Sequence, residues 1–270
     1  MPELPEVEAV RRQLEPVMVG VRITRVEVNR PDLRAPFPRG FARRIAGATT
    51  LSLARRAKYL VASLSSGDSV LMHLGMSGSF RVPHQSDAGD RHDHVVFHLA
   101  SGADVIFNDP RRFGFMDLVR TARLDRHPSL RGLGPEPLSA EFDAGALARA
   151  CAGKRTSLKA ALLDQQVVAG LGNIYAVEAL HVAGLSPLRR ASTIATPAGA
   201  PREAAERLTA AIKQVLEEAI ERQSSAPYRT DRFRVYDRER ERCRRPRCPG
   251  VIRRRTQAGR SSFYCPVCQK

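Results

Sequence analysis

The spacing of apolar positions changes twice along the chain. Val7, Val10 and Leu14 recur at helical intervals, so residues 3–18 are expected to form an amphipathic helix. From about residue 22 to 120 the apolar positions instead form short β-branched runs bounded by turn residues. The expected strands cover 24–29, 51–53, 59–64, 69–74, 94–99 and 104–108.

Turn residues indicate how these strands connect. Ser66-Gly67-Asp68 and Ser101-Gly102-Ala103 each separate two apolar runs, as in a β-hairpin. Because no helical pattern lies between the strands, we expect an antiparallel sandwich or barrel. A linker rich in proline and glycine follows at 127–139.

The second half returns to the helical period. Ser139 could cap a helix that runs to residue 152, and Thr156 could cap another that runs to about 166. Further helices are expected at 174–183 and 202–222. The turn GLGN at 170–173 is open to two interpretations: an ordinary connection between helices, or a helix start that aims backbone N–H groups at a phosphate.

Composition and charge narrow the class of protein. The chain has 270 residues, 43% of them hydrophobic, which is enough for two domains and a small module. No run approaches the ~18 apolar residues of a membrane span, and the N-terminus does not resemble a signal peptide, so we expect a cytoplasmic protein without membrane contact. The 44 Lys+Arg against 28 Asp+Glu give a net charge of +16, which favours a polyanionic partner.

The positive charge is concentrated near the C-terminus. Residues 221–270 hold 15 Lys+Arg and 5 Asp+Glu, so +10 of the +16 lies there. Arginine binds phosphate well because its donors form a planar fork. Aromatic residues are sparse at 6%, so duplex DNA or structured RNA is favoured over single strands. The alternative is an arginine-rich solvated surface that reflects a GC-rich genome.

Four cysteines predict a structural metal site. Their spacing is C-x4-C-x16-C-x2-C, typical of two ligand pairs separated by a hairpin. The predicted ligands of one structural Zn²⁺ are Cys243, Cys248, Cys265 and Cys268. Disulfides are the alternative, which a cytoplasmic location disfavours.

The N-terminus carries candidate covalent chemistry. Removal of Met1 would expose the secondary amine of Pro2, whose pKa of about 8 leaves part of it unprotonated near neutral pH. Such an amine can attack an aldehyde carbon and form an iminium ion. Glu3 and Glu6 stand beside it for proton transfer. Lys58, the only lysine before residue 154, is a further candidate, although many proteins begin Met-Pro and one lysine can occur by chance.

Several motifs together resemble the bacterial formamidopyrimidine-DNA glycosylases. The chain opens with PELPEVE at 2–8. In family order there follow RRAKYL (55–60), HLGMSG (73–78), HDHV (92–95), NDPRRFG (108–114), GLGNIY (170–175) and FYCPVCQK (263–270). The resemblance covers essentially the whole chain.

This resemblance implies a multidomain α+β protein with DNA in the cleft between its domains. The expected domains are an N-terminal helix with an antiparallel β-sandwich (1–133), a helix–two-turn–helix domain (139–222) and a C-terminal zinc-finger hairpin (236–270). It also implies a monomeric base-excision repair enzyme acting on double-stranded DNA with oxidised or abasic lesions. Such an enzyme flips the damaged nucleotide, removes the base through a Schiff base and cleaves the strand by β,δ-elimination.

The resemblance also assigns roles to individual residues. The implied catalytic residues are Pro2 as nucleophile, Glu3 as general acid, Lys58 in elimination and Arg260 in δ-elimination. Met76, Arg111 and Phe113 match residues that fill the space left by the flipped base. His92, Lys154 and Asn173 match contacts to the DNA backbone.

Two departures from the family pattern affect these expectations. The first cysteine pair is C-x4-C where C-x2-C is usual, and zinc sites tolerate that spacing. The segment 222–234, which covers the flipped oxidised purine in the family, is short here. We therefore expect cleavage of formamidopyrimidines and abasic sites to be retained better than recognition of 8-oxoguanine.

Two alternatives stay open at this point. One is an endonuclease VIII-like glycosylase for oxidised pyrimidines, disfavoured by Leu4 and the Arg111–Phe113 segment. The other is a non-catalytic zinc-ribbon protein that binds damaged DNA, which would explain the charge and the cysteines but not Pro2, Glu3 and Lys58 in matching contexts.

Overall fold

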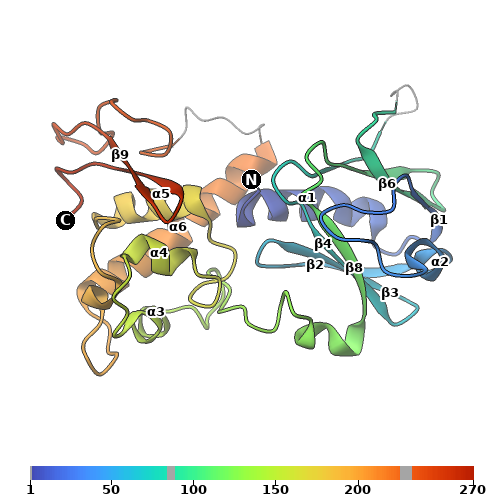
Figure 1. Cartoon of the computed structure of the whole chain (residues 1–270), viewed down its shortest axis with the longest axis horizontal. Helices are drawn as coiled ribbons and strands as arrows, with labels where there is room; N and C mark the ends of the chain where they lie inside the picture. Colours follow the sequence, from blue (N-terminus) through green and yellow to red (C-terminus); the bar gives the residue numbers. More distant parts are fainter. Residues whose placement is uncertain (1, 84–88, 226–232) are drawn as a thin grey trace. The chain divides into compact units, whose positions relative to one another are not determined.

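The computed structural model describes residues 2–83, 89–225 and 233–270. The chain divides into two compact units (Figure 1). The first contains Glu6–Arg131 with Pro2, and the second contains Gly132–Lys270 with Glu3–Pro5. The predicted three-domain boundaries, including the separate C-terminal module from 236, stay a prediction. No helix in these described ranges is long and apolar enough to cross a membrane.

The first unit contains two four-stranded antiparallel sheets. One has the strand order β1-β6-β7-β5 and the other β2-β3-β4-β8. Apolar side chains from both sheets form one core with helix α1, which confirms the predicted sandwich. Its elements are α1 (Leu4–Met18), β1 (Ile23–Val28), α2 (Phe41–Ile45), β2 (Thr50–Arg56), β3 (Tyr59–Leu64), β4 (Asp68–His73), β5 (Ser79–Arg81), β6 (Asp93–Leu99), β7 (Asp104–Asn108), β8 (Phe115–Arg120) and the 3₁₀ helix η1 (Thr121–Arg126).

The predicted strands all form, but the sequence pattern missed four elements of the first unit. Both predicted hairpins are confirmed, because β3 pairs with β4 and β6 pairs with β7. The missed elements are α2, β5, β8 and η1. The first two have only five and three residues, too few to show a period.

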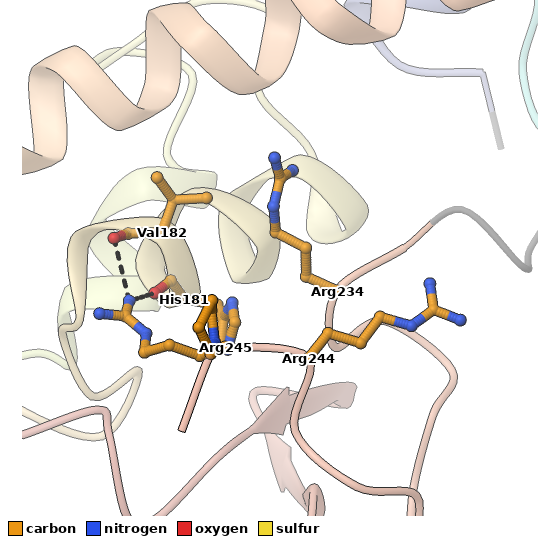
Figure 2. A pocket seen from close by; sticks show the side chains of 6 residues that line it. His181, Val182, Arg234, Arg244 and Arg245 are labelled. Atoms are coloured by element: carbon orange, nitrogen blue, oxygen red, sulfur yellow. Dashed lines mark hydrogen bonds between the residues drawn. The ribbon is translucent and has the colours of Figure 1, made fainter. Parts of the chain in front are cut away.

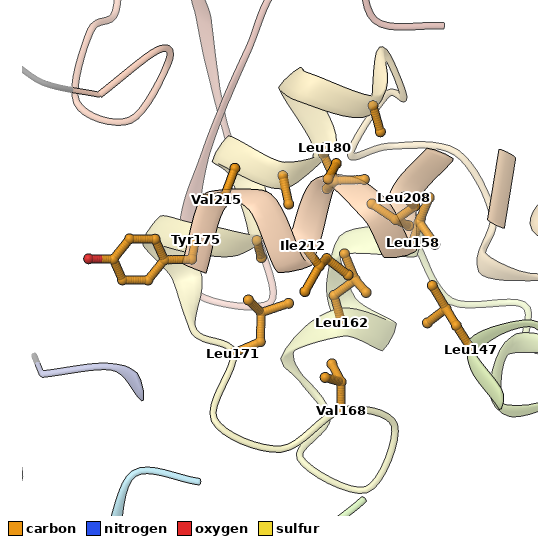
Figure 3. Close-up of a cluster of buried hydrophobic side chains, with 14 of the residues drawn as sticks. Leu147, Leu158, Leu162, Val168, Leu171, Tyr175, Leu180, Leu208, Ile212 and Val215 are labelled. Atoms are coloured by element: carbon orange, nitrogen blue, oxygen red, sulfur yellow. The ribbon is translucent and has the colours of Figure 1, made fainter. Parts of the chain in front are cut away.

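The second unit is helical and ends in a two-stranded hairpin. Its elements are α3 (Ala144–Cys151), α4 (Leu158–Leu163), α5 (Asn173–Ala183), the 3₁₀ helix η2 (Ala191–Ile194), α6 (Glu203–Ser225), β9 (Arg253–Gln257) and β10 (Arg260–Tyr264). Leucines and valines of α3, α4, α5 and α6 point inward and form its core (Figure 3).

Two predicted helix caps were wrong. Asp143, not Ser139, caps α3 by accepting from Ala146 N at 2.6 Å. Ser139 instead donates to the Glu136 carbonyl in the preceding turn. Ser157, not Thr156, caps α4. Ser, Thr and Asp are all good caps, so only the tertiary path of the chain decides which one begins the helix.

Candidate active site and metal centre

Two exposed loops of the first unit pack against each other. The loop after β4 carries Met76 and the loop before β8 carries Phe113, and these side chains are 41% and 42% exposed. The Arg111 guanidinium lies 4.9 Å from the Phe113 ring centre. Gly75 permits this packing, because its φ is +63° and a β-carbon there would lie 2.2 Å from the Phe113 backbone carbon. The structure thus brings the three predicted void-filling residues together.

A buried carboxylate joins the two loops. Asp109 is fully buried, and its Oδ1 accepts from Ser77 Oγ at 2.5 Å while its Oδ2 accepts from Gly114 N at 2.8 Å. Its backbone N–H donates to the His92 carbonyl at 3.1 Å, so a predicted DNA contact lies beside the same loops. Asp109 was not among the predicted site residues, although it belongs to the NDPRRFG motif at 108–114.

Lys58 lies at the tip of a two-residue hairpin turn. The preceding Ala57 has φ +53°, and strands β2 and β3 pair on either side. Nearby, burial first and then the charges of Lys58 and Arg34 lower the pKa of His73 to about 4. His73 is therefore neutral at pH 7, and its Nδ1 accepts from Gly75 N at 3.0 Å. His73 thus connects the surroundings of Lys58 with the Met76 loop.

Glu3 is buried against the N-terminal end of α5. It is 2% exposed, and its Oε1 accepts from Ile174 N at 2.9 Å while its Oε2 accepts from Tyr175 N at 3.4 Å. A β-carbon on Gly172 would lie 2.1 Å from the Glu3 carboxyl carbon, so only glycine fits there. Of the two interpretations of the GLGN turn, the helix start does aim N–H groups at an anion, but that anion is Glu3. Pro2 is the residue that directly precedes Glu3 in the chain.

The C-terminal hairpin contacts the same region of the second unit. The Ser261 carbonyl accepts from Asn173 Nδ2 at 3.1 Å and from Lys159 Nζ at 2.9 Å. Lys159 also donates to Ser262 Oγ at 2.7 Å. Arg260, the first residue of β10, is exposed beside these contacts. Predicted site residues Glu3, Asn173 and Arg260 therefore lie around Lys159.

Lys159 was not among the predicted site residues. Its side chain is 1% exposed, and burial, together with the charge of Arg260, lowers its pKa to about 8. The charge of Glu3 acts in the opposite direction. The sequence signal that could have identified Lys159 is its place inside the apolar run LKAALL. A charged residue is seldom buried unless it has a partner, so one in such a run indicates a special role.

A further buried carboxylate, that of Glu178, binds the chain at the end of the shortened segment 222–234. Glu178 of α5 is 2% exposed and accepts from the backbone N–H groups of Arg234, Val235 and Tyr236 at 2.7–2.9 Å. The segment 222–234 itself lies partly outside the described residues, at 226–232.

Lys154, a predicted contact to the DNA backbone, also belongs to the second unit. Its Nζ lies 3.9 Å from the Asp164 carboxylate, and its side chain is 40% exposed.

The four predicted metal ligands are grouped. Their sulfur atoms all lie within 4.8 Å of one another. The Cys243–Cys268 and Cys248–Cys265 sulfur distances are 3.7 and 3.6 Å. Tetrahedral zinc with bonds of about 2.3 Å separates its sulfurs by about 3.8 Å, so this group has the dimensions of a metal site.

Comparisons with known proteins cover both units. The family model of the formamidopyrimidine-DNA glycosylase N-terminal domain matches residues 1–116, and that of the same enzyme's H2TH domain matches 133–229. The formamidopyrimidine-DNA glycosylase of Bradyrhizobium sp. (strain BTAi1) is 57% identical over 293 aligned residues, which cover 100% of both chains. That of Rhodopseudomonas palustris (strain HaA2) is 58% identical over 292, again with complete coverage.

Solved structures agree with these matches. Lactococcus lactis formamidopyrimidine-DNA glycosylase bound to DNA with an abasic site has a TM-score of 0.88 at 30% identity, with 100% of both chains covered. The same protein bound to DNA with a formamidopyrimidine lesion also has a TM-score of 0.88 at 30% identity, with 99% and 100% covered. Fold and site residues therefore define a DNA repair glycosylase with a helix–two-turn–helix domain. More specifically, the chain belongs to the formamidopyrimidine-DNA glycosylase family.

Proposed function

We propose that this chain is a bifunctional DNA glycosylase and abasic-site lyase that removes oxidised purines, above all formamidopyrimidines, through the amine of Pro2. The observation that supports this most directly is Glu3, a buried carboxylate next to Pro2 in the chain and oriented by two backbone N–H groups of α5. A general acid needs such a fixed position. Family membership favours this function over a non-catalytic zinc-ribbon protein.

The proposed chemistry begins once Met1 has been removed. The Pro2 nitrogen attacks C1′ of the flipped nucleotide, the bond from C1′ to the base breaks, and Glu3 supplies the proton that the departing base takes up. The sugar ring then opens at the C1′–O4′ bond, O4′ takes up the proton that the Pro2 nitrogen loses, and an iminium ion remains. This ion accepts electrons as C2′ loses a proton and β-elimination breaks the C3′–O bond, and again as C4′ loses a proton and δ-elimination breaks the C5′–O bond. Lys58 and Arg260 are the proposed partners of these two elimination steps.

The proposed DNA contacts come from both units. Met76 and Phe113 enter the stack where the base has left, and Arg111 contacts the orphaned opposite base. Their exposure and mutual packing suit this role. His92, Lys154 and Asn173 are the proposed contacts to phosphates, which explains part of the need for a strongly basic chain.

Zinc is the metal that the four cysteines fit best. Burial, together with the neighbouring sulfurs of Cys265 and Cys243, raises the pKa of Cys268 well above its usual range. Four ionised thiols can therefore stand together only when a cation balances them, and soft thiolates in a tetrahedral group favour Zn²⁺. The bound metal would hold the two ends of the β9–β10 hairpin and take no part in the reaction.

The lesion preference depends on the short segment 222–234. The Bradyrhizobium relative aligns over 293 positions whereas this chain has 270 residues, so that relative carries additional residues. Because the segment that covers an oxidised purine is short here, we propose that formamidopyrimidine and abasic-site DNA are better substrates than 8-oxoguanine DNA.

Borohydride trapping tests this function. Protein whose mass shows that Met1 is absent is incubated with duplexes that carry a formamidopyrimidine, 8-oxoguanine or an abasic site opposite cytosine. A covalent adduct on the first and last duplex, lost in Pro2→Gly, is the expected result. Adducts of equal yield on 8-oxoguanine would contradict the narrowed preference, and no adduct on any duplex would overturn the enzymatic function.

A further inference from the structure

The segment between the first two cysteines places an arginine on helix α5. In the segment 244–247, the Arg245 guanidinium donates to the carbonyls of His181 and Val182, the second at 3.1 Å (Figure 2). These carbonyls belong to the last turn of α5, where carbonyl groups have few partners within the helix. The His181 carbonyl also accepts from the backbone N–H of Gly184 at 3.1 Å. The widened pair therefore docks on the C-terminal end of that helix.

His181 contacts the sulfur cluster from the same helical turn. It is 3% exposed, and its Nε2 lies 3.3 Å from Cys243 Sγ and 3.9 Å from Cys268 Sγ. Arg245 adds a backbone N–H to Cys243 Sγ at 3.4 Å. With the ring hydrogen on Nε2, both groups donate to sulfur.

Charge explains what such donors do. A zinc ion with four thiolates carries a net charge of about −2, and buried charge of this kind needs N–H donors or cations around it. A hollow of about 250 Å³ next to the cluster is lined by His181, Arg245, Arg234 and Arg244. Arg234 is paired with Glu218 at 2.9 Å, so the guanidinium groups of Arg244 and Arg245 are the positive charges that this hollow offers to an anionic metal centre.

We propose that His181 and Arg245 are positioning residues of the metal centre. His181 holds the Cys243 thiolate through Nε2–H, and Arg245 holds the widened cysteine pair on the end of α5. This inference rests on the proposed zinc site.

The arrangement connects the metal centre with the candidate active site. Helix α5 has 11 residues and is therefore about 16 Å long. Its first turn binds the Glu3 carboxylate, and its last turn binds Arg245 and presents His181 to the sulfurs. One rigid helix thus supports both.

Zinc release from the full-length protein tests the proposal. The metal content is measured first, and release to an excess of a chromophoric chelator is then followed over time. His181→Phe, which keeps a ring but loses the donor, is expected to release zinc about 10- to 100-fold faster. His181→Gln, which restores an N–H donor, should recover most of this loss. Arg245→Met should also accelerate release, and Arg245→Lys should do so less.

Arg247→Asn is the matched control. It removes one positive charge from the same segment, but its side chain is exposed and forms no hydrogen bond or ion pair with α5 among the described residues. Asparagine also tolerates the φ of +61° at this position. Release from this variant should equal that of the wild type.

Substitution of Co²⁺ for zinc distinguishes a positioning role of His181 from a role as a direct metal ligand. The visible spectrum of the Co²⁺ protein should indicate four sulfur ligands in both the wild type and His181→Phe. A changed ligand-field spectrum in His181→Phe would make His181 a direct ligand and overturn the positioning role. Equal release from wild type, His181→Phe and Arg245→Met would overturn it as well. Wild-type protein without stoichiometric zinc would instead refute the underlying metal site.

Discussion

Two β-hairpins each present a proposed catalytic cation at a two-residue turn, and they are stabilised in different ways. The β2–β3 turn consists of Ala57 and Lys58, and the β9–β10 turn of Ala258 and Gly259 is followed by Arg260. The first hairpin belongs to a four-stranded sheet whose side chains enter the sandwich core. The second is only two strands wide, and every residue of β9 except the last is exposed.

This difference shows how the same local geometry can depend on different forces. Lys58 owes its position to a hydrophobic core that the first unit forms by itself. Arg260 owes its position to four clustered cysteines and to the hydrogen bonds that Ser261 accepts from Asn173 and Lys159. A two-stranded ribbon cannot bury enough apolar surface alone, so the clustered cysteines and these polar contacts act together with a small apolar cluster that includes Val177, Ile252 and Phe263.

Loss of the metal should produce the largest difference between the two hairpins. Structural zinc contributes on the order of 10 kcal/mol to the folding of a small zinc module. In Cys265→Ser we expect loss of zinc, of the β9–β10 hairpin and of at least about 100-fold in strand cleavage, while the sandwich stays folded. Zinc content, circular dichroism and cleavage rates measure these effects. Cys151→Ser, a buried cysteine outside the cluster, is the control and should keep its zinc.

Gly172→Ala tests the anchoring of Glu3 in the second unit. The added β-carbon would displace the carboxylate, and a shift of about 1 Å at a catalytic group costs on the order of 100-fold in rate. We expect this loss for base excision and a much smaller one for cleavage of preformed abasic DNA, measured under single-turnover conditions. Gly132→Ala, where a β-carbon meets open space, should behave as wild type. Equal losses on both substrates would argue against Glu3 as the general acid.

Asp109→Asn tests the corresponding anchor in the first unit. It keeps the shape of the side chain but removes the charge that strengthens the bonds from Ser77 and Gly114. A loss of 1–2 kcal/mol corresponds to roughly tenfold weaker binding of an abasic duplex, measured by fluorescence titration. Exposed Asp125→Asn is the control. If Ser77→Ala added its full effect to Asp109→Asn, the two residues would not act as a unit.

The buried ammonium of Lys159 should be visible as a pH dependence of stability. Its pKa of about 8 in the folded protein is below the ~10.4 of an unfolded chain. The unfolded state therefore binds the proton first as pH falls, which costs up to about 3 kcal/mol of stability below pH 8 and nothing above pH 10.5. Urea unfolding from pH 7 to 10 should show the free energy of unfolding rising in wild type relative to Lys159→Met. Parallel curves would contradict this explanation.

Local sequence patterns predicted the structural features that depend on residues close together in the chain. The period of the N-terminal helix and the glycines of the β3–β4 and β6–β7 turns indicated elements that the structure contains. The cysteine spacing indicated a group that does form. Ser139 and Thr156 were wrong as caps because several capping residues stand near each helix start. Asp109 and Lys159 were missed because burial is not visible from their immediate neighbours.

The sequence by itself determined the family, the change from strands to helices along the chain and the four cysteines that cluster. Only the tertiary structure decided where the carboxylate of Glu3 goes, because its hydrogen-bond partner Ile174 stands 171 residues away. It likewise decided that the Ser261 carbonyl accepts from Lys159 and that Arg245 reaches the end of α5. Once the core has formed, these polar groups have no hydrogen-bond partner close to them in the sequence. Their partners therefore depend on how the elements pack, which sequence spacing cannot indicate.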